Sequence, residues 1–252
     1  MVVCLLSVLL LGPKMTNLTL AEYWANGATW GYFKSAAAIN IQYHLPGVFT
    51  DNPSPNAING SLWSLPYELG CYVALALLSV LPGTMRSKAT LALVAIAALI
   101  LFRPSVPPAN PFTGFLGLDY YDTKLGLMFA LGAVFTCWRD HLRILVWPAF
   151  VMLVVAHFMT QSGLQLLVFL LGLGILTLWL ALYARWLPVV PARIGDWSYG
   201  AYLHGFPVQQ LLAHYKLHEF SFLGYVVMCT LVTFTLAGLS WHLVEKQALR
   251  WR

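Results

Sequence analysis

Apolar residues occur in long uninterrupted runs along this chain. The runs at residues 164–184 and 222–243 contain no Asp, Glu, Lys or Arg. Each is long enough to cross a bilayer as a helix, which takes about 20 residues at a rise of 1.5 Å each. Strands of a membrane β-barrel would show about ten residues of alternating polarity, and no such segment occurs. The pattern therefore predicts membrane-spanning α-helices.

The same pattern predicts an all-α polytopic membrane protein with seven spans and a short N-terminal half-span. The half-span covers residues 1–12, which are too few to cross a membrane alone. The predicted spans are residues 62–81, 88–102, 124–138, 144–159, 164–184, 199–214 and 222–243. We expect a single integral-membrane domain over residues 1–252, with a long loop at residues 13–61.

Composition supports this class. Hydrophobic residues make up 60% of the 252 residues and charged residues only 9%, against about 25% charged in an ordinary soluble domain. This balance excludes a water-soluble globule. Cys4, Cys71, Cys137 and Cys229 all lie in apolar runs, so we expect free thiols and no metal site.

Lysine and arginine residues mark the ends of the predicted spans. Nine lie on one side, in short loops and at the C-terminus, and five lie on the other side, in longer loops. The positive-inside rule places the loops around Arg86, Arg139 and Arg185 and the C-terminus in the cytoplasm, and residues 13–61 outside. Because the basic residues are scattered singly, the net charge of +5 does not indicate nucleic-acid binding. We expect the aromatic, lightly charged outer loop to fold against the membrane surface.

A membrane helix with an acidic residue near its start is predicted after residue 60. Ser61 or Ser64 is the expected helix cap, and Pro66 fits the first turn, where its missing N–H costs nothing. Glu68 then points from the first turns of this helix. An ionisable group at such depth is a functional candidate. The alternative is a carboxylate that only complements the positive end of the helix.

A second polar segment opens the next-to-last predicted span and contains Ser198, Tyr199, Tyr202 and His204. Pro207 should kink this helix and free a backbone carbonyl about one turn earlier. The two tyrosines also fit an interfacial aromatic belt. His204 has the chemistry of a base or hydrogen-bond partner, and the alternative is a structural donor between helices.

Four short motifs resemble, in order, those of the membrane acyltransferase-3 family. They are Asn59-Gly-Ser-Leu-Trp-Ser-Leu-Pro-Tyr-Glu68, Phe129-Ala-Leu-Gly132-Ala, Gly195-Asp-Trp-Ser-Tyr-Gly-Ala-Tyr-Leu-His204-Gly-Phe-Pro207 and Leu243-Val-Glu245-Lys246. The resemblance covers residues 44–252. It implies a bacterial inner-membrane protein that O-acylates cell-surface sugars, with its C-terminus in the cytoplasm.

Two features depart from the family pattern. Family members open with two further spans that carry a histidine and an arginine pair, and these residues have no counterpart here, so the chain is expected to be truncated at its N-terminus and residues 1–12 to correspond to the third span. Many members also carry a histidine directly before the Phe-Pro pair, where this chain has Gly205. His204 lies one residue earlier, about 100° around the helix. The resemblance therefore transfers no catalytic role to His204.

Acyl transfer needs a group that takes the proton of the attacking hydroxyl, and donors for the developing oxyanion. The outer end of the first full span offers a carboxylate and an imidazole, so Glu68 and His44 are the candidate catalytic residues. The candidate substrate-binding residues are polar or aromatic: Asn59, Trp63, Ser198, Tyr202 and His204.

The resemblance implies acyl-coenzyme A as donor co-substrate, a cell-surface carbohydrate or lipid-linked glycan as acceptor, and no tightly bound cofactor. A donor from the cytoplasm would meet Arg139 and Arg143, whose charges suit its phosphates. The alternative is that these arginines only set topology. Two other functions stay open: a small-solute transporter, favoured by Glu68 and the span broken at Pro207, and an inactive remnant that acts only through helix packing.

Overall fold

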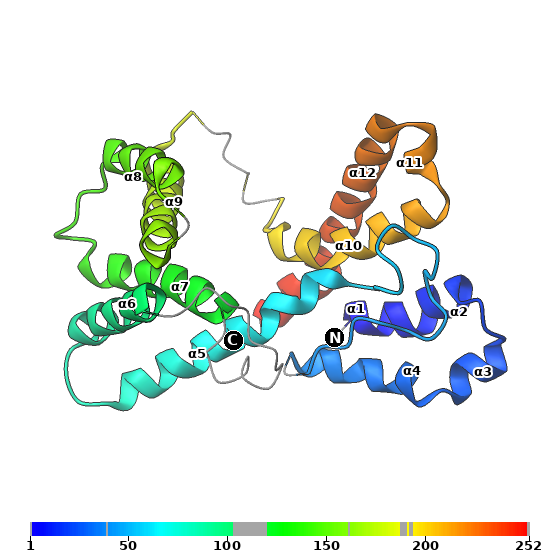
Figure 1. Cartoon of the computed structure of the whole chain (residues 1–252). Helices are drawn as coiled ribbons and strands as arrows, with labels where there is room; N and C mark the ends of the chain where they lie inside the picture. The colour runs from blue at the N-terminus through cyan, green and yellow to red at the C-terminus, as the bar shows by residue number, and fades with distance from the viewer. Residues whose placement is uncertain are drawn as a thin grey trace. The chain divides into compact units, whose positions relative to one another are not determined.

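The computed structural model describes residues 2–38, 40–102, 120–160, 162–186, 191 and 194–250. Regular structure in these residues is helical, apart from two isolated bridges, and the all-α class is confirmed (Figure 1). The chain divides into two compact units. We call Met1–Pro66 with Val189–Arg252 the loop unit, and Tyr67–Pro188 the bundle unit.

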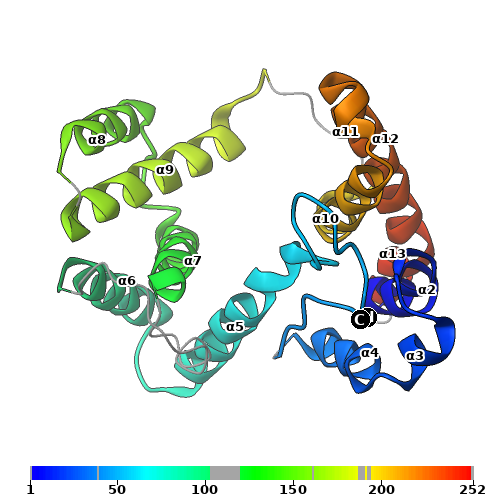
Figure 2. The same cartoon turned by 45° about the vertical axis from the view of Figure 1, so that its right-hand side comes forward.

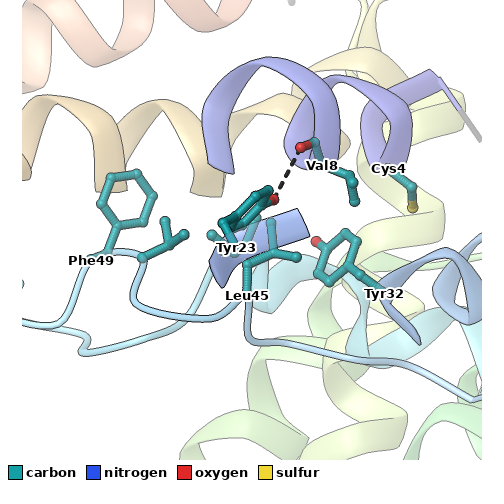
Figure 3. Packing of buried hydrophobic residues seen from close by; sticks show 8 residues of the cluster. Cys4, Val8, Tyr23, Tyr32, Leu45 and Phe49 are labelled. Carbon is teal, nitrogen blue, oxygen red and sulfur yellow. Dashed lines mark hydrogen bonds between the residues drawn. The ribbon is translucent and has the colours of Figure 1, made fainter. Parts of the chain in front are cut away.

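The loop unit begins with an apolar helix that contains a wider turn. It consists of α1 (Val2–Leu6), the π-helical turn η1 (Ser7–Leu11) and α2 (Gly12–Met15). In a π-helical turn the carbonyl of Val8 would accept from the N–H of residue 13, but that residue is Pro13, which has none. The Tyr23 hydroxyl, 3.0 Å away, donates to the Val8 carbonyl instead (Figure 3).

Three short helices follow, and they pack against the first one. These are α3 (Leu20–Ala25), α4 (Gly27–Gly31) and the 3-10 helix η2 (Tyr32–Ala37). Thr19 and Glu22 cap α3 reciprocally, each side chain accepting a backbone N–H of the other. Tyr23 and Tyr32 are fully buried, and Figure 3 shows them beneath α1 and η1, with Tyr32 beside Cys4.

Residues 40–59, which we call the strap, connect η2 to the next helix without regular structure. Isolated antiparallel bridges pair Thr16 with Val48 and His44 with Ala57. Leu45, Val48 and Phe49 are buried in the same cluster as Tyr23. The strap is therefore a packed part of the unit, and its backbone is held by tertiary contacts.

The C-terminal helices complete the loop unit. They are α10 (Ser198–His214), α11 (Leu217–Phe220), α12 (Phe222–Ser240), the π-helical turn η5 (Trp241–Glu245) and α13 (Lys246–Leu249), and Figure 2 shows α10, α11 and α12 grouped together. A Cβ on Gly200 would lie 2.8 Å from the Ala237 Cα, so only glycine permits this approach of α10 to α12. Gly195 has a φ of +91° and lies against the Trp241 indole.

The bundle unit contains five helices: α5 (Leu65–Val80), α6 (Met85–Phe102), α7 (Tyr120–Trp138), α8 (Val146–Phe158) and α9 (Gly163–Tyr183). Pairs α6 with α7 and α8 with α9 lie side by side in both views (Figure 1 and Figure 2). Ile100, Leu127, Leu167 and Leu170 form the buried core where α6, α7 and α9 meet.

In the part of the chain that the structure describes, four helices are long and apolar enough to cross a membrane. They are Gly60–Val80, Met85–Phe102, Gly163–Tyr183 and Phe222–Leu249. Three shorter apolar helices are Val2–Met15, Thr123–Trp138 and Val146–Phe158. A helix is thus present at every predicted span, including α10, while the count of seven spans stays a prediction. The long loop predicted outside the membrane at residues 103–123 falls largely on residues 103–119, which lie outside the described residues.

Candidate functional site

Asn59 connects the strap to the break in α10. Its side chain is fully buried, and its Nδ2 donates to the Leu203 carbonyl at 2.9 Å. Leu203 precedes Pro207 by four residues, so the missing proline N–H leaves this carbonyl without its helical donor. The carbonyl that Pro207 was expected to free is therefore found, and Asn59 supplies its hydrogen bond.

Asn59 also starts the helix that leads into α5. Its Oδ1 accepts from the Ser61 N–H at 3.1 Å and caps the 3-10 helix η3 (Gly60–Ser64). A 3-10 turn capped by Asn59 thus precedes α5, which begins at Leu65 directly after Ser64, and the expected cap at Ser61 or Ser64 stays a prediction. Both ends of the Asn59 amide are thus used within the protein, and a substrate-binding role for it stays a prediction.

A second buried amide pair fastens the strap to α10. Asn52 Nδ2 donates to the Gln210 carbonyl at 2.8 Å, and Gln210 Nε2 donates to the carbonyls of Ser54 and Ala57, both at 2.6 Å. Neither Asn52 nor Gln210 is among the residues predicted from the sequence. Gln210 is a polar side chain inside a predicted span, and such a residue usually needs a partner within the protein. This position alone therefore indicates that Gln210 bonds to another part of the chain.

Hydroxyl groups gather at the start of the helix after Asn59. The Tyr202 hydroxyl contacts the Ser61 carbonyl and lies 2.7 Å from the Ser64 hydroxyl. Because a tyrosine has one hydroxyl hydrogen and a carbonyl only accepts, Tyr202 donates to Ser61 and Ser64 donates to Tyr202. We call Ser61, Ser64 and Tyr202 the hydroxyl cluster. Trp63, in the same turn, is exposed.

His44 lies on the exposed side of the strap. Its Nδ1 is 3.1 Å from the Asn56 carbonyl and therefore carries the proton. The Nε2 atom is then left with the lone pair that a general base needs. The His44 ring lies 6.4 Å from the Tyr43 ring, and Tyr43 interacts electrostatically with Tyr202.

Ser198 and His204 have contacts elsewhere. The Ser198 N–H and hydroxyl both donate to Asp196 Oδ1, at 3.0 and 2.6 Å, and they hold the pKa of the Asp196 carboxyl below its usual value. His204 is buried and interacts electrostatically with Glu245, whose Oε1 accepts from the Ser240 hydroxyl at 2.7 Å. The side-chain partners of these two residues thus differ from those of Tyr202, and their substrate-binding roles stay predictions.

Glu68 lies where the sequence predicted it, in the first turn of α5, and its side chain is exposed. Pro66 occupies the same turn, as expected. This position suits either a reacting carboxylate or one that complements the helix N-terminus. The catalytic role of Glu68 stays a prediction.

Basic residues at one end of the bundle unit fall into two kinds. Arg86 Nε donates to the Cys137 carbonyl at 3.0 Å and stacks over Trp138, while Lys88 Nζ donates to the Leu78 carbonyl at 2.7 Å. These two cations therefore satisfy the last carbonyls of α7 and α5. They also bring the loops at residues 81–88 and 138–145 to the same end of the unit.

Arg139 and Arg143 belong to the second kind. Both are exposed in the turn between α7 and α8, and Arg139 Nε lies 3.8 Å from Asp140 Oδ1. An exposed pair at this distance is weak, so both guanidinium groups can reach a ligand. Their predicted role in holding coenzyme A phosphates stays a prediction. Arg193, expected on the same side, lies outside the described residues.

Comparison with known proteins gives two matches. The sequence profile of a family described as "Acyltransferase domain" matches residues 2–242. The chain is also 27% identical, over 197 residues, to the "O-acetyl transferase" of Shigella phage Sf6. This match covers 76% of the chain and 57% of the relative, so the chain spans little more than half of that relative's length. No solved structure matches the chain.

Proposed function

Because the chain belongs to the membrane acyltransferase-3 family, we propose that it moves an acyl group from a donor to a hydroxyl group. The match to the family over residues 2–242 carries this proposal. The name of the phage relative, O-acetyl transferase, supports oxygen as the accepting atom. We further propose acyl-coenzyme A as donor and a cell-surface carbohydrate or lipid-linked glycan as acceptor.

In this proposal His44 is the general base. Its Nε2 takes the proton of the acceptor hydroxyl while the acceptor oxygen bonds to the thioester carbonyl carbon. The carbon–sulfur bond then breaks, and the same proton passes from His44 to the departing thiolate. This role is supported by the hydrogen bond from Nδ1 to Asn56, which fixes the tautomer. Glu68 is the alternative candidate for the base.

The hydroxyl cluster supplies hydrogen bonds to the reacting oxygens. The hydrogens of Tyr202 and Ser64 are donated to the Ser61 carbonyl and to Tyr202, so in this proposal the Ser61 hydroxyl is the cluster's donor to a developing oxyanion. Trp63, exposed beside them, offers a ring for a sugar face. Arg139 and Arg143 are the proposed contacts for the phosphates of the donor.

The proposed location is the bacterial inner membrane, with several membrane passes and a cytoplasmic C-terminus. The excess of basic residues in the short loops supports this orientation. The hydrogen bond between Arg86 and Cys137 agrees with it, because two loops assigned to the cytoplasm lie at the same end of the bundle unit.

The test is acyl transfer by the full chain reconstituted in lipid nanodiscs. Acetyl-coenzyme A with a labelled acetyl group is supplied with a bacterial membrane glycan fraction, and ester formation on the glycan is measured. His44→Asn keeps a donor in the place of Nδ1 but removes Nε2, so transfer should fall by roughly 100-fold to 10,000-fold if His44 is the base. His242→Asn, an exposed histidine of η5, serves as matched control and should keep full activity.

Each alternative has its own outcome in this system. Unchanged transfer by His44→Asn refutes the role of His44 and makes Glu68 the base to examine. Uptake of a solute into vesicles without any covalent product refutes acyl transfer and favours a transporter. A well-folded chain with neither activity refutes the enzymatic proposal.

A further inference from the structure

Two helices of the loop unit run side by side in the same direction. Val3, near the start of the first helix, packs with Leu203 of α10, and Val8 lies in the next cluster, against which Leu211 packs. Met15 and His214 therefore end at the same side of the unit. The position of each residue between Thr16 and Leu62 can therefore be given as the level along these two helices at which it packs.

The loop first runs from the level of Met15 back to the level of Val3. Thr16 follows the end of α2, the Tyr23 hydroxyl bonds to Val8, and η2 packs against α1. Ile41 then packs against Val3 at the far end. The first helix rises about 1.5 Å per residue, so the descent from the level of Met15 to that of Val3 is about 18 Å.

The strap then returns to the first end and descends again. Thr16 donates to the Pro46 carbonyl at 2.7 Å, and the Phe49 ring lies 5.7 Å from the His214 ring. Asn59 next bonds to Leu203, and Leu62 packs with Val3. The segment thus runs down, back and down again beside the first helix, which is apolar, and α10, which packs on the membrane-length helix α12. A surface loop would stay at the level of Met15 and His214.

The irregular backbone of this segment is satisfied by the protein itself. The Ile58 N–H donates to the Tyr43 carbonyl at 2.7 Å, and the Gln42 N–H donates to the Ser35 hydroxyl at 2.7 Å. The Asn52 and Gln210 amides bind further strap and helix carbonyls. Non-helical backbone is tolerated at membrane depth only when it is buried in protein or lines a cavity, and these hydrogen bonds give the bonded part of the segment its partners within the protein.

The side of the loop away from α1 is apolar. Leu20 and Trp30 are 56% and 53% exposed, and Trp30 packs on Trp24 and Phe33 with ring centroids 5.7 and 6.3 Å away. We call Leu20, Trp24, Trp30 and Phe33 the Trp30 face. Leu20 and Trp24 are one helical turn apart on α3, so the four side chains form a continuous row.

Three polar groups next to the Trp30 face are used internally. The Glu22 carboxylate accepts from Thr19, Asn26 Oδ1 accepts from the Ala28 N–H, and the Trp30 indole N–H donates to the Trp24 carbonyl. A sugar-binding surface would need such groups to face outward, whereas lipid acyl chains need none. Leu9 and Leu10 of the first helix are exposed apolar side chains as well.

We propose that residues 16–62 form a re-entrant segment, which enters the membrane from the side where Met15 and His214 end and returns to that side. The Trp30 face contacts the lipid acyl chains of that leaflet. By the charge asymmetry this is the outer leaflet. The segment then does not lie flat on the membrane surface, as the sequence alone suggested, because its tertiary contacts continue down the length of two helices.

The experiment measures the membrane depth of spin labels on the full chain in nanodiscs. The four cysteines are replaced by alanine, and single cysteines are introduced at Leu20, Ala28 and Ala37, all exposed on the loop helices. Collision with oxygen and with a water-soluble nickel complex gives the depth of each label. Lys216→Cys, in the turn between α10 and α11, is the water control. Leu231→Cys is the lipid control, because the Leu231 side chain of α12 is 59% exposed.

We expect the labels to become deeper from Leu20 to Ala37, by about 10 Å, and all three to be protected from nickel. Equal shallow depths would refute the re-entrant path and restore a surface loop. Strong nickel collision at every position would show contact with water. Protection from both reagents, or cross-linking between the introduced cysteines, would show that protein covers the Trp30 face, and this too overturns the proposal. Trp30→Cys repeats the measurement if one variant fails to fold.

Discussion

The hydrogen bond from Asn59 to Leu203 exists because of Pro207, and this dependence can be measured. Asn59→Ala leaves the buried Leu203 carbonyl without a partner, which costs about 1–3 kcal/mol. It also removes the cap of η3, worth about 0.5–2 kcal/mol. We therefore expect a strong loss of unfolding free energy from this one substitution.

Pro207→Ala should remove the cost of leaving the Leu203 carbonyl without a partner. An alanine at this position would bring a backbone N–H that can donate to the Leu203 carbonyl four residues earlier. In that background Asn59→Ala should lose mainly its capping contribution. The double-mutant cycle should therefore give a coupling free energy of about 1–3 kcal/mol between positions 59 and 207.

The assay is reversible unfolding of the full chain in mixed micelles of mild detergent and dodecyl sulfate, followed by circular dichroism. Asn17→Ala is the matched control, because Asn17 is an exposed asparagine of the same loop, and it should shift stability by less than about 0.5 kcal/mol. An equal cost of Asn59→Ala with and without Pro207 would refute the reasoning, since the carbonyl would then not depend on the proline.

Further predictions concern charge, donor binding, orientation and packing. Glu68→Gln should lower acyl transfer without changing membrane insertion; unchanged turnover would leave only a helix-end carboxylate worth about 0.3–1 kcal/mol. Replacing Arg139 and Arg143 together by glutamine should raise KM for acyl-coenzyme A, and an unchanged KM would leave them a topological role. A cysteine at Asp51 should react with an impermeant reagent from outside the cell, and one at Arg143 only from the cytoplasm; the reverse labelling would refute the orientation. Gly200→Val should lower the melting temperature strongly, because even a Cβ would lie 2.8 Å from the Ala237 Cα; a normal melting temperature would contradict that packing.

Local sequence patterns were enough for the class of protein and for the positions of its helices. The uninterrupted apolar runs at residues 164–184 and 222–243 became α9 and α12 almost within their predicted bounds. Pro207 was enough to predict a freed carbonyl, because a proline affects atoms in its own helix. These features depend only on residues close in sequence, so a single chain reveals them.

The identity of long-range partners was beyond the sequence. Asn59 looked like a polar residue available to a substrate, and the structure uses its donor on Leu203, 144 residues away. No role was predicted for Gln210, although its amide donates to the strap carbonyls of Ser54 and Ala57. A buried amide has several possible carbonyl partners, and sequence spacing cannot choose among them.

The sequence by itself thus determined an all-helical membrane protein, its acyltransferase family resemblance and a helix broken at Pro207. Only the tertiary structure decided that the loop after Met15 packs along the first helix, that Tyr23 serves the carbonyl left by Pro13, and that Tyr202 meets Ser61 and Ser64. The physical reason is the range of the forces. Apolar run length and missing N–H groups act within a few residues, whereas the depth of a loop is set by burial and hydrogen bonds between segments that meet only when the chain has folded.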